Sequence, residues 1–167
     1  MRVRRSWRQH EAQKPVRNNT VTEEWYARPV LFVADVDRTL DFYVNRLGFT
    51  QSWRFEDGGK AQVAQADRQG CALTFSSQWP DKVGKGLIFI SLNVEAPEGE
   101  ILAEVAAAAL DRLRTELESR QVNVAEGEWG YRVLIVRDPD GNELYFPYPD
   151  VGKETPQADK PSGYRDA

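Results

Sequence analysis

The chain has 167 residues and a mass of 19.0 kDa, and its 41% hydrophobic and 29% charged residues fit one globular domain with polar ends. No apolar run is long enough for a membrane span, and no apolar stretch follows the basic start as in a secretory signal, so we expect no membrane partner. Cys71 is the only cysteine, which excludes an intrachain disulfide and agrees with a reducing cytoplasm.

The net charge of −4 is unevenly distributed. Residues 1–28 hold seven Lys and Arg against three Glu, a net +4, whereas the other 139 residues hold 15 basic and 23 acidic groups, a net −8. An acidic body repels nucleic acid and attracts cationic small molecules, although such a surface also serves solubility alone. The basic start carries no DNA-binding pattern, so we expect no nucleic-acid partner.

Composition divides the chain into three parts. Residues 1–26 lack an apolar period and are predicted to form a flexible basic arm. Residues 27–149 carry the globular pattern. Residues 150–167 are rich in Pro, Lys and Asp and are predicted to form a disordered tail.

The first half of the domain predicts a strand, a helix and three strands. Residues 30–33 are β-branched and aromatic, Asp35 is a helix N-cap, and apolar residues recur at helical spacing until Gly48, a left-handed C-terminal cap. Glycine-containing turns then separate three further predicted strands, at residues 49–56, 60–67 and 71–76.

The second half predicts the same order again. We expect a strand at residues 86–94, a long helix at 97–120 and a short edge strand at 122–124. A hairpin follows, with strands at 131–137 and 143–148 around the turn Asp138-Pro139-Asp140-Gly141-Asn142. The expected fold class is therefore α+β, with two βαβββ modules that form a cup-shaped, partly closed mixed sheet. A ligand would lie on the concave face, against every second residue of each strand.

Two segments together resemble one known family. ARPVLFVADVDRTLDFYVNRLGF, residues 27–49, and GYRVLIVRDPDGNELYFPYP, residues 130–149, look like the two ends of a domain of the glyoxalase/bleomycin-resistance/dioxygenase, or vicinal oxygen chelate, superfamily. The resemblance implies a cup-shaped site that a homodimer commonly completes.

The resemblance also implies where a metal would bind. The positions of the four family ligands are held by Arg28, Thr74, Phe89 and Tyr145, of which one is a permanent cation and two are poor ligands. Glu143 shares strand parity with Tyr145 and could be a displaced ligand, but one carboxylate cannot form a site. We therefore predict no metal and no cofactor.

No other catalytic group replaces the metal. The only histidine, His10, lies in the arm, so the domain has no Ser-His or Cys-His pair. Cys71 lies in an apolar strand and fits the core better than a nucleophile. Asp138 and Asp140 flank Pro139, so turn chemistry explains them better than acid–base catalysis. No catalytic residue is predicted.

The closest resemblance is to the metal-free branch of the family, which sequesters antibiotics of the bleomycin type. Aromatic positions that sandwich the drug there correspond to Trp53 and Trp129, and two indoles can hold a planar cation. The predicted function is metal-free binding of a small molecule in a cytoplasmic homodimer, through Trp53, Trp129, Phe89, Tyr145, Arg28 and Thr74. Two alternatives remain: a metal-dependent or cofactor-free lyase, isomerase or dioxygenase of the same superfamily, and a partner domain in which the basic arm captures another protein.

Overall fold

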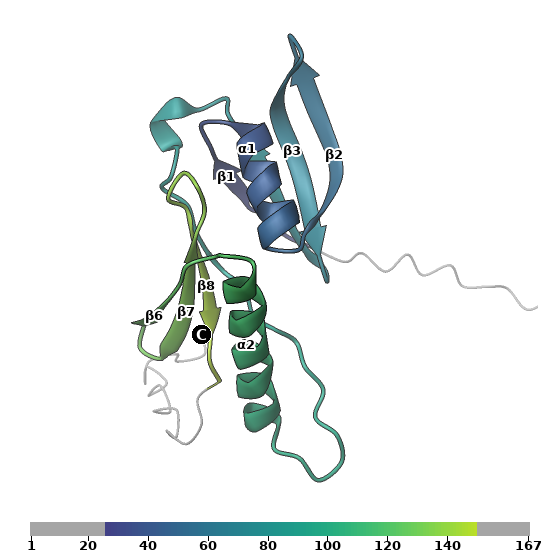
Figure 1. Cartoon of the computed structure of the whole chain (residues 1–167), viewed down its shortest axis with the longest axis vertical. Coiled ribbons are helices and arrows are strands. Elements are labelled where there is room, and N and C mark those ends of the chain that lie inside the picture. Colours follow the sequence, from purple (N-terminus) through teal and green to yellow (C-terminus); the bar gives the residue numbers. More distant parts are fainter. Residues whose placement is uncertain (1–25, 150–167) are drawn as a thin grey trace, which may run out of the picture.

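The computed structural model describes residues 26–149, which form two βαβββ units (Figure 1). The predicted arm, apart from Tyr26, and the predicted tail lie outside the described residues. The first unit comprises β1 (Val30–Phe32), α1 (Val36–Asp41), η1 (Phe42–Arg46), β2 (Thr50–Asp57), β3 (Lys60–Arg68) and β4 (Cys71–Ser76). After η2 (Pro80–Lys82), the second comprises β5 (Leu87–Phe89), α2 (Leu102–Ser119), β6 (Val124–Glu128), β7 (Arg132–Arg137) and β8 (Glu143–Pro147).

Each unit folds into its own four-stranded sheet. The strand order is β1-β4-β3-β2 in sheet A and β5-β8-β7-β6 in sheet B, so the first and last strands of each unit pair in parallel and the others in antiparallel. The predicted α+β fold is confirmed. Within residues 26–149 no strand of one sheet pairs with a strand of the other, so the cup is not closed inside one chain.

The first helix begins and ends where the sequence predicts. The Asp35 side chain caps it by accepting a hydrogen bond of 3.1 Å from the Arg38 backbone N–H, and Gly48 ends it at φ +73°. Its last turn is a π-helix, in which the Leu47 N–H donates to the Phe42 carbonyl. The helix buries Leu40 and Tyr43 against sheet A.

Each helix covers one face of its sheet and leaves the other face free (Figure 1). In the second unit, Leu113 and Leu117 of α2 are buried in the same cluster as Leu134 and Leu144 of sheet B. This cluster also contains the core under α1, so the two units share one hydrophobic core. No helix within the described residues is long and apolar enough to cross a membrane.

Three predicted elements of the second unit have different bounds in the structure. The helix expected at 97–120 begins only at Leu102, and the edge strand expected at 122–124 is Val124–Glu128. The strand expected at 86–94 ends at Phe89. The Ile90 N–H donates to the Tyr145 carbonyl at 2.9 Å, and the next bond of this parallel ladder would need an N–H from Pro147, which has none.

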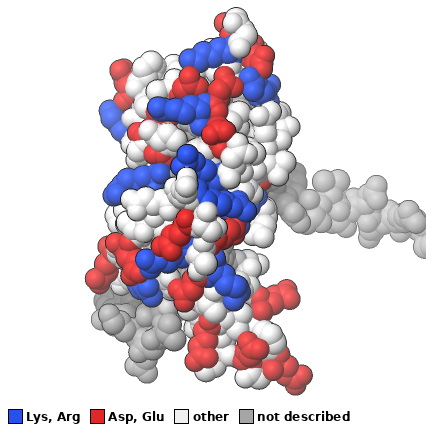
Figure 2. Space-filling model, viewed as in Figure 1, with Lys and Arg blue, Asp and Glu red and all other residues white. Residues whose placement is uncertain are grey.

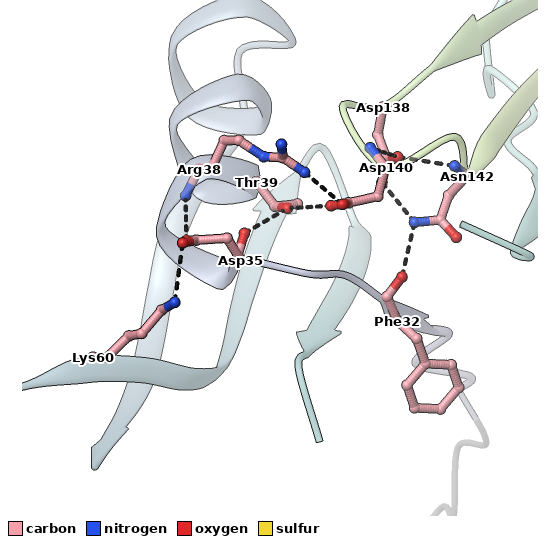
Figure 3. A network of polar contacts seen from close by, with 8 residues as sticks. All are labelled: Phe32, Asp35, Arg38, Thr39, Lys60, Asp138, Asp140 and Asn142. Carbon is pink, nitrogen blue, oxygen red and sulfur yellow. Dashed lines mark hydrogen bonds and ion pairs between the residues drawn. The ribbon is translucent and has the colours of Figure 1, made fainter. Parts of the chain in front are cut away.

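The hairpin turn of the second unit binds the first unit (Figure 3). The buried Asn142 amide donates to the Phe32 carbonyl of β1 at 3.2 Å and accepts from the Gly86 N–H at 2.9 Å. Asp140 pairs with Arg38 and accepts a 3.3 Å hydrogen bond from the Thr39 hydroxyl. The Asp140 carboxylate and the Asn142 amide thus join the two units, whereas Asp138 bonds only within the turn, in agreement with the interpretation of both carboxylates as turn residues.

Candidate ligand-binding faces

The helix-free face of sheet A carries a row that includes two of the predicted residues. Thr74 pairs with Val30 on one side and with Gln65 on the other, and Gln65 pairs with Trp53. The Trp53 Nε1–H donates to Gln65 Oε1 at 3.1 Å, and Gln65 Nε2 donates to Asp67 Oδ1 at 3.0 Å. This chain of hydrogen bonds orients the indole, which remains 45% exposed and available to a ligand.

The helix-free face of sheet B carries a group of three aromatic rings, here called the aromatic triangle: Phe89, Trp129 and Tyr145. Phe89 and Tyr145 are cross-strand partners with ring centroids 5.4 Å apart, and each ring lies 5.9 Å from Trp129. All three contacts are edge-to-face, the geometry that aromatic quadrupoles favour. The Trp129 side is open, because this residue is 55% exposed.

A short polar chain fixes Tyr145 in the triangle. The Tyr145 hydroxyl donates to Glu143 Oε2 at 3.0 Å, and the Arg137 Nε–H donates to Glu143 Oε1 at 2.8 Å. The hydrogen bond to Glu143 raises the pKa of Tyr145, so the phenol stays neutral and keeps its proton. Both Glu143 oxygens are engaged, which leaves this carboxylate poorly placed to be a displaced metal ligand.

The residues at the four family metal positions do not fit a divalent ion. Phe89 and Tyr145 use these positions for the aromatic triangle, and the Arg28 guanidinium lies 4.8 Å from the ring of Tyr26. In the described part of the chain, no group of three His, Cys, Asp or Glu side chains is arranged to hold a metal. A site of this kind needs several N, O or S donors around one point.

Charges near the two faces are partly neutralised by their neighbours. Of the acidic groups beside Trp53 and Trp129, Glu56 pairs with Arg54, and Glu126 pairs with Arg114 and Arg132. The hydrogen bond from Arg132, and to a smaller extent the one from Arg114, lowers the pKa of Glu126. Figure 2 shows acidic and basic side chains intermingled over most of the face in view. Attraction of a cation would therefore depend on the two neighbouring acidic residues that form no ion pair within residues 26–149, which are Asp57 and Glu128.

One chain does not form the predicted sandwich of two indoles. Trp53 is bonded within sheet A, and Trp129 contacts rings of sheet B only. The structure brings Phe89, Tyr145 and Trp129 together, and it joins Thr74 to Trp53 through Gln65. Sequence reasoning missed Gln65, because only the strand register shows that this residue lies between them.

A cavity of about 650 Å³ lies on the helix side, between α2, the chain after β5 and the β3–β4 turn. Leu92, Leu113 and Phe146 line it together with Cys71, which the sequence did not connect with any cavity. Burial raises the pKa of the Cys71 thiol, so this cysteine is a poor nucleophile at neutral pH.

Comparison with known proteins defines the class to which this fold belongs. Residues 25–146 match the family described as the Glyoxalase/Bleomycin resistance protein/Dioxygenase superfamily. The chain belongs to this superfamily, as its two terminal segments indicated. No curated protein matches the chain.

Solved structures with a similar fold include binding proteins and an enzyme. A bleomycin-binding protein from bleomycin-producing Streptomyces verticillus, complexed with copper(II)-bleomycin, has a TM-score of 0.56 and 23% identity, over 77% of this chain and 99% of that chain. TnmS3, an antibiotic binding protein from Streptomyces sp. CB03234, has a TM-score of 0.55 and 18% identity, and the match covers 75% of this chain and 97% of that chain. A lactoylglutathione lyase from Agrobacterium tumefaciens has a TM-score of 0.50 and 15% identity, over 75% and 95%. At these identities the similarity shows a shared fold and does not choose between binding and catalysis.

Proposed function

We propose that this protein binds a small molecule without breaking a bond, and that the ligand carries a planar cationic aromatic group, as antibiotics of the bleomycin type do. The observation that carries the proposal is the aromatic triangle. It occupies two of the positions where metal-dependent relatives need ligand donors, and its Trp129 ring is open to solvent.

The proposed site lies between two subunits. Exposed apolar side chains gather on the helix-free faces, namely Val30, Trp53 and Phe55 of sheet A and Leu87 and Phe89 of sheet B. Exposed apolar surface of this kind is a common mark of an interface or a binding groove. A homodimer that places sheet A of one subunit opposite sheet B of its partner would bring Trp53 and Trp129 to the same ligand.

The chemistry of the two faces matches such a ligand. A planar cation between two indoles gains stacking and cation–π attraction, each worth about 0.5–2 kcal/mol. The Gln65 side chain holds the Trp53 ring in one orientation, and Glu143 holds Tyr145, so few rotamers are lost on binding. Low-identity similarity to a bleomycin-binding protein supports the choice of the first ligand to test.

The enzymatic alternative gains no support from a specific observation. It would need a metal near Glu143, but Arg137 and Tyr145 already bond both oxygens of this carboxylate. A lyase of the same fold is nevertheless among the similar structures, so metal-dependent turnover belongs in the test as a contrary outcome.

The experiment is a tryptophan-fluorescence titration of the full chain with a bleomycin-type glycopeptide at two salt concentrations. We expect saturable quenching at about one ligand per subunit, weaker at high salt. Trp53→Ala and Trp129→Ala should each weaken binding at least about fivefold, whereas Trp79→Phe, a conservative change at another half-exposed tryptophan, should not. Absence of quenching at micromolar ligand, or equal effects of all three substitutions, would contradict the proposal.

A further inference from the structure

The helix-covered side of the fold holds the cavity of about 650 Å³ described above, which the proposed aromatic site does not use. This volume lies within the range of about 300–1,000 Å³ that is common for small-molecule sites. The walls come from both units: α2 and the chain after β5 on one side, and the β3–β4 turn with the chain between η1 and β2 on the other. Figure 1 shows the chain after β5 running beside α2.

The lining of the cavity changes from apolar to polar as its residues become more exposed. The buried lining residues are all apolar, namely Leu47, Phe49, Leu113, Leu117 and Phe146, and the exposed ones are all polar, namely Gln69, Ser91, Asn93 and Arg112. An apolar base under a polar rim fits an amphipathic molecule. The base gains from contact with hydrocarbon and offers no partner to a buried polar group.

The charges of the lining favour an anion at the rim. Three lining residues are charged, and they are Arg68, Arg112 and Glu116. Glu116 is already shared, because one carboxylate oxygen accepts from Arg68 at 2.9 Å and the other lies 3.1 Å from Arg120. Arg112 forms no ion pair within residues 26–149. Its guanidinium is therefore the charged group of the lining that is free to bind a ligand.

Unpaired backbone groups also border the cavity. Residues 91–94 follow β5, and none of them forms a backbone hydrogen bond within the described part of the chain. Leu92 and Val94 are half-buried in the lining, which places this backbone in the wall. Its N–H groups and the Arg112 guanidinium are donors that a carboxylate can accept from, and hydrogen bonds to an ionised acceptor are stronger than neutral ones.

We propose that this cavity is a second ligand site, which takes an apolar molecule that ends in a carboxylate, such as a medium-chain fatty acid. The hydrocarbon chain lies between Leu92, Leu113 and Phe146, and the carboxylate stays at the rim with Arg112. A carboxylate at the apolar base would lose its hydration without gaining a partner, so the hydrocarbon end is the one that enters. The inference does not depend on the proposed function, since the cavity lies on the helix side of the fold and the aromatic triangle on the helix-free side.

Calorimetric titration of the full chain with decanoate, below the concentration at which it forms micelles, tests the site. We expect saturable binding of one decanoate per chain, at least about threefold tighter than binding of decanol or decylamine. Cys71 lines the cavity and is the only cysteine of the chain, so bound decanoate should also slow alkylation of its thiol several-fold.

Two matched pairs of substitutions on α2 locate the ligand. Ala109→Trp fills the cavity and should abolish binding of decanoate, whereas Ala108→Trp, at the neighbouring exposed position outside the lining, should not. Arg112→Gln should weaken binding of decanoate about three- to fivefold and leave binding of decanol unchanged. Arg114→Gln should not weaken it, because Arg114 lies outside the lining and forms its ion pairs with α2 and β6.

Reversal of the rim charge gives a further test, since Arg112→Glu should make decylamine the tighter ligand. Saturable binding that survives Ala109→Trp would overturn the cavity as the site. Equal binding of decanoate and decanol by the unmodified chain would overturn the role of the carboxylate. Absence of saturable binding, or an unchanged alkylation rate of Cys71, would overturn the proposal as a whole.

Discussion

The Asn142 side chain donates a hydrogen bond of 3.2 Å to the backbone carbonyl of Phe32, which lies in the other βαβββ unit. Asn142 is fully buried, and its amide also donates to Asp138 at 2.8 Å. The pKa of Asp138 is raised, because burial outweighs the hydrogen bonds that stabilise its charge. One amide therefore joins β1 to a turn whose buried Asp138 carboxylate is costly to desolvate.

We expect Asn142→Ala to lower the free energy of unfolding by about 2–4 kcal/mol, because it leaves buried polar partners unsatisfied. Urea denaturation followed by circular dichroism measures this loss. Asn45→Ala is the matched control, since Asn45 bonds Asp41 on the exposed surface of the first helical segment, and it should cost less than about 0.5 kcal/mol. Equal losses would show that the bridge between the units contributes little.

The Tyr43 hydroxyl is a buried polar group without a partner in the described structure. The residue is 0% exposed, and burial raises its pKa well above the usual range. Because removing an unsatisfied buried hydroxyl saves its desolvation cost, Tyr43→Phe should leave the stability unchanged or raise it by up to about 1 kcal/mol. Thermal unfolding would measure the change, with Tyr131→Phe, at a half-exposed ring, as the neutral control. A clear loss of stability would mean that the hydroxyl has a partner.

The raised pKa of Tyr148 should make the free energy of unfolding fall at alkaline pH. Burial and a 2.7 Å hydrogen bond to Asp111 raise the pKa of Tyr148 to about 12. The folded state therefore favours the neutral phenol, which contributes to the free energy of unfolding. This contribution is complete below the unfolded pKa of about 10 and is lost as the pH rises towards 12. Unfolding free energies measured between pH 9 and pH 12 should fall, and less steeply in Tyr148→Phe. An unchanged slope in this variant would contradict the assignment.

Gly48 tests the contact between β3 and α2. A Cβ at this position would lie 2.7 Å from Arg120 Nη1 and 3.1 Å from Arg68 Nη1, in the cluster that both arginines form with Glu116. Gly59 is the matched control, because it has a similar φ of +76° but no atom within 4 Å of a Cβ. Both alanine substitutions should cost about 1 kcal/mol for the left-handed backbone, and Gly48→Ala should cost more, since the arginines must move. Chemical denaturation of the two variants measures the difference, and equal costs would show that the cluster adapts freely.

The local signals in the sequence were sufficient for much of the fold. Asp35 and Gly48 bound the first helix as predicted, because capping depends on residues within a few positions in the chain. The turn at Asp138 also follows from a short-range pattern, namely turn chemistry, since the Asp138 carboxylate accepts hydrogen bonds from the backbone two and four residues further on.

Other features depend on contacts between distant residues, which no local pattern specifies. The sequence alone determined a βαβββ repeat and the superfamily of the chain. Only the tertiary structure decided that Gln65 lies between Thr74 and Trp53, that Glu143 is bonded by Arg137 and Tyr145, and that Pro147 stops the ladder after Ile90. The physical reason is that caps and alternation are properties of neighbouring residues, whereas register and side-chain partners are selected when whole elements pack together.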